Sequence, residues 1–368
     1  MQFTITHKDL LKSLSHVVPI AERKSTIPIL TNIKIEAGNN LVFTTTNTDI
    51  ETIETVPAQI IEEGKTTVPA HILYDIARTL TEDEVSFATK DGKMVISAGK
   101  AKFSLPMLPA DDFPMMSGTS LPFKFKISPD DLISLIDKTK FAVSNEETRY
   151  YLNGIYLHVV EKDGQNLLRS SATDGGRLAI YDVPAPEGSK GMPSVIVPKQ
   201  VIAELRKFLD SSDKDITVEV SETKTRFLFE NATMTSKLID GKYPNYLAVI
   251  PKGNDKKLIV NTAKFKNCVA RMSSVSIDKF QAVKMIIEKD SLTLTANSPE
   301  AGTGTEEMVA SYDGETIEIL FNYKKLLDMT NQVETEELEF SLANSTAPAI
   351  MKEKGNDHFL YVIMPLRL

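Results

Sequence analysis

The stretch FTITHKDLLKSL, residues 3–14, decides the fold because the chain uses the same pattern three times. It returns as FKISPDDLISLI at residues 125–136 and, more loosely, as LIVNTAKFKNCV at residues 258–269. Each copy predicts a short alternating strand followed by a helix with one apolar face. The repeat indicates that one structural unit is used three times, so the question of function becomes what three copies can enclose.

A second landmark follows the first in every third of the chain. Val68-Pro69, Val197-Pro198 and Phe321-Asn322 each end a strand pattern and precede apolar residues at helical spacing. Together the two landmarks predict two short helices per third. The six expected helices cover residues 7–15, 71–80, 129–140, 198–209, 262–271 and 322–331.

Most of the remaining sequence predicts antiparallel strands. The turn signals Lys90-Asp91-Gly92 and Asp163-Gly164 each separate two alternating apolar runs, as in a β-hairpin. Because strands outnumber helices, we expect an α+β fold in which each third packs antiparallel sheets on two helices. Candidate linkers are residues 112–122, which contain Pro114, Gly118 and Pro122, and residues 251–257, which are polar and rich in lysine. The expected domains are residues 1–121, 122–251 and 252–368.

Composition places the chain among ordinary globular proteins. It has 368 residues, 42% hydrophobic and 25% charged, and its single cysteine, Cys268, cannot form an internal disulfide. The first residues lack a basic segment followed by a long apolar one, which argues against a signal peptide. No apolar run approaches the roughly 18 residues that a membrane span needs. We therefore expect a cytoplasmic protein without a membrane partner.

The charges are distributed unevenly. The six expected helices contain 13 Lys or Arg and 7 Asp or Glu residues, so they carry +6 and the rest of the chain carries −14, for a net charge of −8. Basic helices in an otherwise acidic chain suit a polyanion that meets one surface only. The alternative is that Lys and Arg are simply good helix formers, and the charge count alone does not separate the two.

No motif for catalysis or metal binding emerges from the sequence. The histidines lack zinc-ligand spacing; they are His7, His16, His71, His158 and His358. Gly64-Lys65-Thr66 resembles the end of a phosphate loop, but Gln59 stands where that motif needs its first glycine. Gly302-Thr303-Gly304 lacks the third glycine of a dinucleotide fingerprint. We expect no cofactor and no metal.

The most enzyme-like string is TDGGR, residues 173–177, which combines a carboxylate, flexible backbone and a cation. A turn needs the same residues, because Asp caps the turn and Gly tolerates positive φ. Part of the string also echoes TNTD at residues 46–49 in the first third. We therefore interpret it as repeat scaffolding and expect no catalytic residue in it.

The three repeats, the basic helices and the missing catalytic motif together resemble the beta subunit family of bacterial DNA polymerase III, the sliding clamps. Several strings in the same order carry the resemblance, which spans residues 3–368. They are TIPIL at 26–30, RYYLNG at 149–154, ATDG at 172–175, RLA at 177–179, SKLIDG at 236–241, YP at 243–244 and YVIMPLRL at 361–368.

This resemblance implies a head-to-tail homodimer that closes into a ring of six similar domains, with helices lining a central hole. Such a ring holds double-stranded DNA by topology, independent of sequence, and tethers the polymerase without doing chemistry. A clamp that slides needs phosphate-directed contacts and no reading of base edges. The implied protein partners are the DNA polymerase III alpha subunit, the clamp loader and other proteins with a clamp-binding motif.

The resemblance also implies site residues, and the charge count adds Lys138, Lys266 and Lys324 as DNA contacts. The DNA contacts that the resemblance implies are Lys12, Arg23, Lys24, Lys199, Lys242 and Lys284. A groove for partner peptides is implied with the wall residues Leu152, Thr173, Gly175, Arg177, Leu178, Pro244, Val249, Val362, Met364 and Pro365. Of these, Leu178 and Val249 could equally be ordinary core residues. The dimer seam is implied to join Lys102, Phe103 and Leu105 to Ser274, Val275 and Glu300 of the other copy.

Four residues depart from the pattern of the family. Gly176 stands where a histidine is common, which would widen or loosen the groove. His71 replaces a more basic residue, Ser274 is less apolar than expected at a seam, and Glu146 places an acid before Arg149. These departures bear on individual site residues and on the strength of the dimer.

Two other classes of protein compete with a clamp. One is a monomeric, repeat-built hydrolase or transferase with its site between domains, against which the missing acid–base pair counts. The other is a scaffold that binds only peptides, for which basic helices would be unnecessary.

Overall fold

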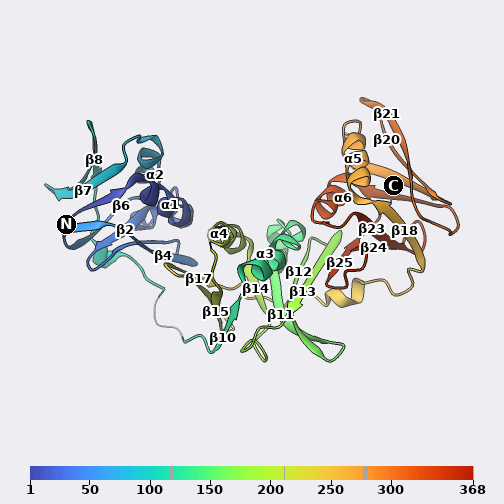
Figure 1. Cartoon of the computed structure of the whole chain (residues 1–368), viewed down its shortest axis with the longest axis horizontal. Coiled ribbons are helices and arrows are strands. Elements are labelled where there is room, and N and C mark those ends of the chain that lie inside the picture. The colour runs from blue at the N-terminus through green and yellow to red at the C-terminus, as the bar shows by residue number, and fades with distance from the viewer. Residues whose placement is uncertain (117–119, 211, 277–280, 368) are drawn as a thin grey trace. The chain divides into compact units, whose positions relative to one another are not determined.

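Antiparallel strands dominate the computed structural model, which describes residues 1–116, 120–210, 212–276 and 281–367 (Figure 1). The described residues form six α-helices and 25 strands, so the predicted α+β class is confirmed. Residues 117–119 of the first predicted linker and the terminal Leu368 lie outside the described residues. The helices are α1 (His7–Val17), α2 (Ala70–Thr79), α3 (Pro129–Asp137), α4 (Lys199–Leu209), α5 (Thr262–Ser273) and α6 (Tyr323–Thr330).

Side-chain caps fix where three of these helices begin. The Thr6 hydroxyl accepts a hydrogen bond from the Asp9 backbone N–H at 3.1 Å, ahead of α1. The side chains of Asn261 and Asn322 accept in the same way from N–H groups three residues on, ahead of α5 and α6. Each cap satisfies a donor that the first helical turn leaves free, which is why strand turns to helix at these residues.

The chain packs into two compact units. The first consists of Met1–Asp130, Pro186–Pro193 and Gln200–Leu238. The second consists of Asp131–Ala185, Ser194–Lys199 and Ile239–Leu368. The middle third of the sequence thus contributes strands to both units.

Two antiparallel sheets build the first unit. One has five strands in the order β5 (Gln59–Glu62), β1 (Gln2–Thr6), β7 (Glu84–Lys90), β8 (Lys93–Ala98) and β9 (Ala101–Pro106). The other has eight strands in the order β10 (Phe123–Ile127), β15 (Ile216–Val220), β16 (Lys224–Leu228), β17 (Ala232–Lys237), β4 (Ile50–Val56), β3 (Leu41–Thr46), β2 (Asn32–Ala37) and β6 (Gly64–Pro69).

Two further antiparallel sheets build the second unit. The eight-stranded sheet has the order β14 (Val195–Pro198), β11 (Gly154–Lys162), β12 (Gln165–Thr173), β13 (Arg177–Pro184), β25 (Phe359–Ile363), β24 (Ala349–Glu353), β23 (Glu337–Leu342) and β18 (Lys256–Asn261). The four-stranded sheet has the order β21 (Gly302–Val309), β20 (Ser291–Ser298), β19 (Ala282–Glu288) and β22 (Ile317–Asn322).

Each eight-stranded sheet joins two consecutive thirds of the chain by direct strand pairing. In the first unit β17 pairs with β4, from Ala232 opposite Glu54 to Ser236 opposite Ile50. In the second unit β13 pairs with β25, with Arg177 opposite Ile363. At both junctions, consecutive thirds of the chain are therefore joined by hydrogen-bonded strands as well as by the connecting linker.

The predicted hairpins are confirmed. Strands β7 and β8 pair on either side of Asp91 and Gly92, whose φ angles are 49° and 72°. Strands β11 and β12 pair on either side of Asp163 and Gly164, with φ angles of 52° and 77°. Two successive residues with positive φ make the tight turn that matches the twist of paired strands.

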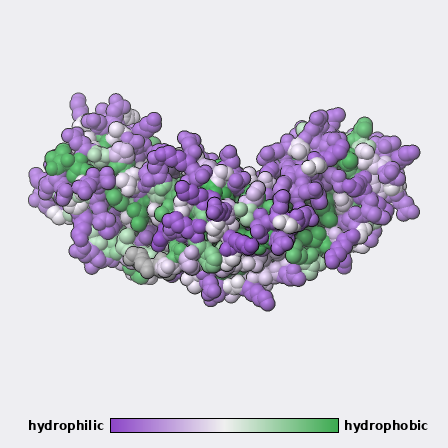
Figure 2. Space-filling view, turned by 60° about the horizontal axis from the view of Figure 1, so that its bottom comes forward, coloured by the Kyte–Doolittle hydropathy of each residue, from purple (hydrophilic) through white to green (hydrophobic). Residues whose placement is uncertain are grey.

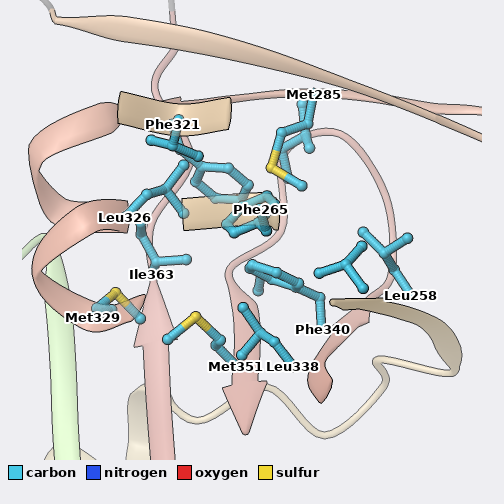
Figure 3. Close-up of a cluster of buried hydrophobic side chains, with 14 of the residues drawn as sticks. Leu258, Phe265, Met285, Phe321, Leu326, Met329, Leu338, Phe340, Met351 and Ile363 are labelled. Atoms are coloured by element: carbon cyan, nitrogen blue, oxygen red, sulfur yellow. The ribbon is translucent and has the colours of Figure 1, made fainter. Parts of the chain in front are cut away.

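The apolar faces of the helices close the cores of both units. In the first unit Leu10 and Leu14 of α1 are fully buried beside Leu73 of α2. In the second, Phe265 of α5 lies 5.3 Å from the ring of Phe340, and both belong to the cluster in Figure 3. Helices α1 and α2 lie side by side, as do α5 and α6 (Figure 1). The helical pairs thus hold their sheets and leave their opposite faces to solvent.

Candidate functional site

The string 173–177 forms the turn between β12 and β13. The Asp174 side chain accepts hydrogen bonds through Oδ1 from the backbone N–H groups of Gly176 (2.9 Å) and Arg177 (3.1 Å). Gly175 has φ of +85°, a conformation that other residues rarely adopt. The expected turn is therefore found, and the Asp174 carboxylate is engaged in holding it.

Arg177 links this turn to two other segments of the second unit. Its guanidinium donates to Asp174 Oδ2 at 3.1 Å, to Asp328 Oδ2 at 2.7 Å and to the Phe141 carbonyl. It also lies 5.1 Å from the centre of the Phe141 ring. A half-buried arginine with this many acceptors positions β13 against α6.

Gly176 makes room for a lysine. A Cβ added to Gly176 would lie 2.0 Å from Lys325 Nζ, so the space that a side chain would take is filled by this ammonium group. Lys325, on α6, donates to Asp174 Oδ1 at 3.2 Å. We expected Gly176 to widen or loosen the surface, and that expectation is wrong because Lys325 occupies the space. Nothing in the sequence pattern singled out Lys325.

A compact apolar cluster lies next to this turn in the second unit. It combines Leu152, at the end of the 3-10 helix Glu147–Leu152, with residues of β13, β14 and β25 and with residues that follow position 241. Its buried members are Leu152, Leu178, Ile180, Ile196, Tyr243, Tyr246 and Val362. The Met364 backbone N–H donates to the Gly176 carbonyl at 3.0 Å, which ties the end of β25 to the β12–β13 turn.

The predicted groove residues separate into a buried base and an exposed set. Leu152, Leu178 and Val362 are buried in the cluster. Val249, which we considered a possible core residue, is 52% exposed, and Met364 is 41% exposed. The others range from half-buried to exposed: Thr173, Gly175, Arg177, Pro244 and Pro365. Leu247, 50% exposed, was not predicted, although it shares a short 3-10 helix with Val249. Apolar side chains exposed over an apolar base are typical of a docking surface.

A stack of aromatic rings supports the cluster and was not predicted. The Tyr156 ring stacks on Tyr243 at 4.5 Å and on His158 at 4.3 Å. His158 Nε2 lies 2.9 Å from the Tyr246 hydroxyl, and no partner for Nδ1 is found among the described residues. Burial, helped by the charge of Arg169, lowers the pKa of His158 to about 4. His158 is therefore neutral in the folded protein at neutral pH.

This histidine predicts a loss of stability in mild acid. Between pH 6.5 and 4 the unfolded chain takes up a proton at His158 that the folded chain does not, so stability falls as the pH decreases. The full effect is about 3 kcal/mol, at about 1.4 kcal/mol per pKa unit. Calorimetry measures the midpoint temperature of thermal unfolding at pH 7 and at pH 5. We expect this temperature to decrease less between the two pH values in His158→Gln than in the unchanged protein. An unchanged pH dependence in the variant would contradict this assignment.

Most of the predicted DNA-contact residues have side chains exposed on the surface. Among the described residues no hydrogen-bonding or ion-pair partner is found for the side chains of Lys12, Arg23, Lys24, Lys242, Lys266 and Lys324, all of which are exposed. Lys199 is exposed and donates to Asn145 Oδ1 at 3.0 Å. The face shown in Figure 2 is mostly covered by hydrophilic residues, with hydrophobic residues in separate patches.

Two predicted DNA contacts are differently placed. Lys138 is buried, and its ammonium group donates to the Gln332 carbonyl, to Glu334 at 2.8 Å and to Glu353 at 3.3 Å. It is committed to these groups, and we withdraw it as a DNA contact. Lys284 lies on β19 and forms an ion pair with Glu318 of β22.

The predicted seam residues lie at two sheet edges. Lys102, Phe103 and Leu105 belong to β9, the last strand of the five-stranded sheet. Val275 lies 3.0 Å from where a Cβ of Gly304 on β21 would be, and Glu300 is exposed in the turn just before β21. Strand β21 is in turn the last strand of the four-stranded sheet. Ser274 is exposed and caps the end of α5.

The remaining departures from the pattern have local partners. Glu146 receives two hydrogen bonds from the Arg149 guanidinium, which lower the pKa of the Glu146 carboxyl. This acid therefore neutralises its neighbour. His71 Nε2 lies 2.9 Å from the Ala21 carbonyl oxygen and helps hold the loop that carries Arg23 and Lys24.

Among the described residues, no group of three or more His, Cys, Asp or Glu side chains could hold a metal ion. In the same part of the chain no helix is long and apolar enough to cross a membrane.

Three repeats of antiparallel sheet and two helices, with an exposed apolar surface and no metal-binding group of side chains among the described residues, are typical of a clamp-type protein. Family models agree along the chain: the N-terminal, central and C-terminal domains of the DNA polymerase III beta subunit match residues 1–117, 126–245 and 247–367. The chain belongs to the DNA polymerase III beta subunit family, the sliding clamps, which are non-catalytic processivity subunits.

Individual relatives match over their full length. A beta sliding clamp of Caulobacter vibrioides is 44% identical over 372 residues, and that of Escherichia coli K12 is 34% identical over 371, with 100% of each chain covered. A solved sliding clamp of Bartonella birtlesii bound to griselimycin superposes with a TM-score of 0.96, is 42% identical and is matched over 100% of both chains.

Proposed function

We propose that two copies of this chain join head to tail into a closed ring of six domains that encircles double-stranded DNA in the cytoplasm. The ring tethers the polymerase III alpha subunit and docks the clamp loader and other partners at the apolar surface of the second unit. Each domain corresponds to one of the predicted ranges 1–121, 122–251 and 252–368. The order of strands at the two internal junctions carries this proposal.

The internal junctions predict where a second copy pairs. Strand β1 begins the first third as β10 begins the second, so the sheets β1-β7-β8-β9 and β10-β15-β16-β17 correspond, and β9 is the counterpart of β17. By the same correspondence β21 is the counterpart of β13 and β4. Since β17 pairs with β4 and β25 with β13, the edges left over are β9 and β21. These edges belong to different surfaces, so their pairing between copies is head to tail and can close.

Features of the two edges support this pairing. Val309 on β21 is 86% exposed, an apolar side chain at a free strand edge. Long uncovered edges invite strand addition, and proteins usually blunt them unless they serve as interfaces. The predicted seam residues Lys102, Phe103 and Leu105 lie on β9, and Val275 and Glu300 lie beside β21.

Contact with DNA rests on exposed cations that have no partner among the residues the structure describes. Lys12, Arg23, Lys24, Lys242, Lys266 and Lys324 provide charges that are free to meet phosphates, and Lys199 and Lys284 would exchange a present partner for phosphate. Such contacts position the duplex without reading its sequence, which suits sliding.

Retention on DNA tests the ring. The protein is loaded onto a nicked circular plasmid by its clamp loader, separated from free protein, and the DNA is then linearised by a single cut at moderate salt. We expect the protein to stay on the circle and to leave the linear form through its ends. Full retention on linear DNA with open ends would overturn the proposal, and blocking both ends should restore retention.

Mass in solution provides the independent control. Light scattering at micromolar concentration should give twice the chain mass of 40.8 kDa. A persistent monomer would contradict a stable ring and would favour the alternative hypothesis of a scaffold that binds only peptides.

A further inference from the structure

We propose that Lys325 is a specificity residue of the apolar docking surface and selects partner peptides that carry an aspartate or glutamate beside their apolar anchor. This inference rests on the proposed function, because it concerns which peptides the surface prefers. Neither Lys325 nor the space above Gly176 belongs to the groove residues that the sequence indicated.

The first observation is that Gly176 is not needed for the backbone. Its φ lies outside the left-handed region, unlike the φ of +85° at Gly175. What the missing side chain provides is space, since a Cβ would lie 2.0 Å from Lys325 Nζ and 3.3 Å from Lys325 Cε. The glycine therefore lets the ammonium of α6 reach the turn between β12 and β13.

The second observation is that Lys325 is only partly compensated. Asp174 Oδ1, its one acceptor among the described residues, also accepts from the N–H groups of Gly176 and Arg177. Asp174 Oδ2 accepts from Arg177 Nε. One carboxylate thus serves four donors, and the contact to Lys325, at 3.2 Å, is the longest of them. An ammonium group has three donors, so two remain for a ligand.

The neighbouring charges are better matched. Arg149 forms two hydrogen bonds with Glu146 and a third with the Asp174 carbonyl. Arg177 shares two carboxylates, Asp174 and Asp328, and a carbonyl. Among these three cations at the turn, Lys325 therefore has the fewest acceptors for its positive charge. A negatively charged side chain of a partner peptide is favoured beside it over a positively charged one.

The third observation places this charge beside the apolar surface. The Gly176 carbonyl accepts from the Met364 N–H, and Leu178, two residues beyond Gly176, is part of the buried base. A peptide with its apolar side chain over this base would bring an adjacent residue to Lys325. The Lys325 side chain is 30% exposed, so a carboxylate can reach it without displacing protein.

A peptide scan tests this inference. The probes are fluorescein-labelled hexapeptides with leucine and phenylalanine anchors, in which each other position in turn is Asp, Asn or Lys, and affinity is read by fluorescence anisotropy. At one position we expect Asp to bind about twofold to fivefold more tightly than Asn, as for a partly exposed ion pair, and Lys to bind more weakly than either. The preference should shrink as salt is raised.

Three variants assign the preference to Lys325. Lys325→Met keeps the length of the side chain and should bring the Asp to Asn ratio to about one, whereas Lys325→Glu should reverse the order of Asp and Lys. Gly176→Ala should lower the ratio because the added Cβ displaces the ammonium group. The matched control is Lys257→Met, which removes an ion-paired lysine on β18, four strands from β13. This control should keep the wild-type ratio.

The outcomes separate the two proposals. Binding of Asn and Asp peptides with equal affinity would overturn the role of Lys325 and leave the docking surface intact. A preference for Asp that persists in Lys325→Met would also overturn it. If no peptide of the scan binds, the docking surface itself fails, and the role of Lys325 fails with it.

Discussion

Met364→Asp is expected to abolish peptide binding and to leave the dimer intact. Met364 is exposed directly after β25, and its backbone is fixed by the hydrogen bond to Gly176. A carboxylate there must lose water when an apolar side chain of the peptide covers it, and this desolvation opposes docking. Loss of one central apolar contact in a docking surface typically costs 2–4 kcal/mol, which lowers affinity by about 30-fold to 1000-fold.

The measurement uses the tightest neutral peptide of the scan, so that its result does not depend on Lys325. Ile61→Asp is the matched control, because Ile61 is a similarly exposed apolar residue on β5 in the first unit. We expect the control to bind the peptide like the unchanged protein. Unchanged affinity in Met364→Asp would refute the assignment of this surface, and light scattering shows whether either variant has lost the dimer.

The repeat made most of the fold predictable. Short turn motifs such as Asp91-Gly92 predict hairpins, because the two strands of a hairpin are neighbours in the sequence. The junctions between thirds were not predictable in the same way. The pairing of β13 with β25 joins residues that lie almost half the chain apart, and no local pattern encodes which sheet edges meet.

The site was predictable where it depended on linear strings and not where it depended on distant partners. Val249 looked like a core residue because it lies in an apolar run, but its short 3-10 helix turns it outward. Lys325 was missed because its position depends on a glycine in a turn about 150 residues earlier. Lys138 was misplaced for the same reason, since its burial depends on Glu334 and Glu353 in the last third.

The corrected position of Lys138 predicts a large effect on stability. Its side chain is 8% exposed, and that of its partner Glu353 is 5% exposed. Glu353 Oε1 also accepts from the Glu334 backbone N–H at 2.9 Å, and Oε2 accepts from Asn356 at 2.7 Å. These bonds hold the carboxylate in place, so it cannot turn toward water when the lysine is removed.

We therefore expect Lys138→Met to destabilise the second unit by about 3–5 kcal/mol, the usual result of leaving a buried charge without its partner. The Tyr361 hydroxyl donates to the Lys138 carbonyl at 2.6 Å, a bond that the substitution keeps, so the loss reports on the ammonium group. Hydrogen exchange followed by mass spectrometry should show amides of β24 and β25 exchanging faster by roughly 150-fold to 5000-fold, which is this loss of free energy expressed as a change in exchange rate.

Two comparisons show whether the cause is the buried charge. Lys140→Met removes an exposed lysine that pairs with Asp137 at 2.6 Å, and it should cost less than about 1 kcal/mol. Adding Glu353→Gln to Lys138→Met should recover part of the stability, because the unpaired charge is then gone. Equal effects of Lys138→Met and Lys140→Met would contradict the buried pair and would return Lys138 to the exposed cations proposed to meet DNA.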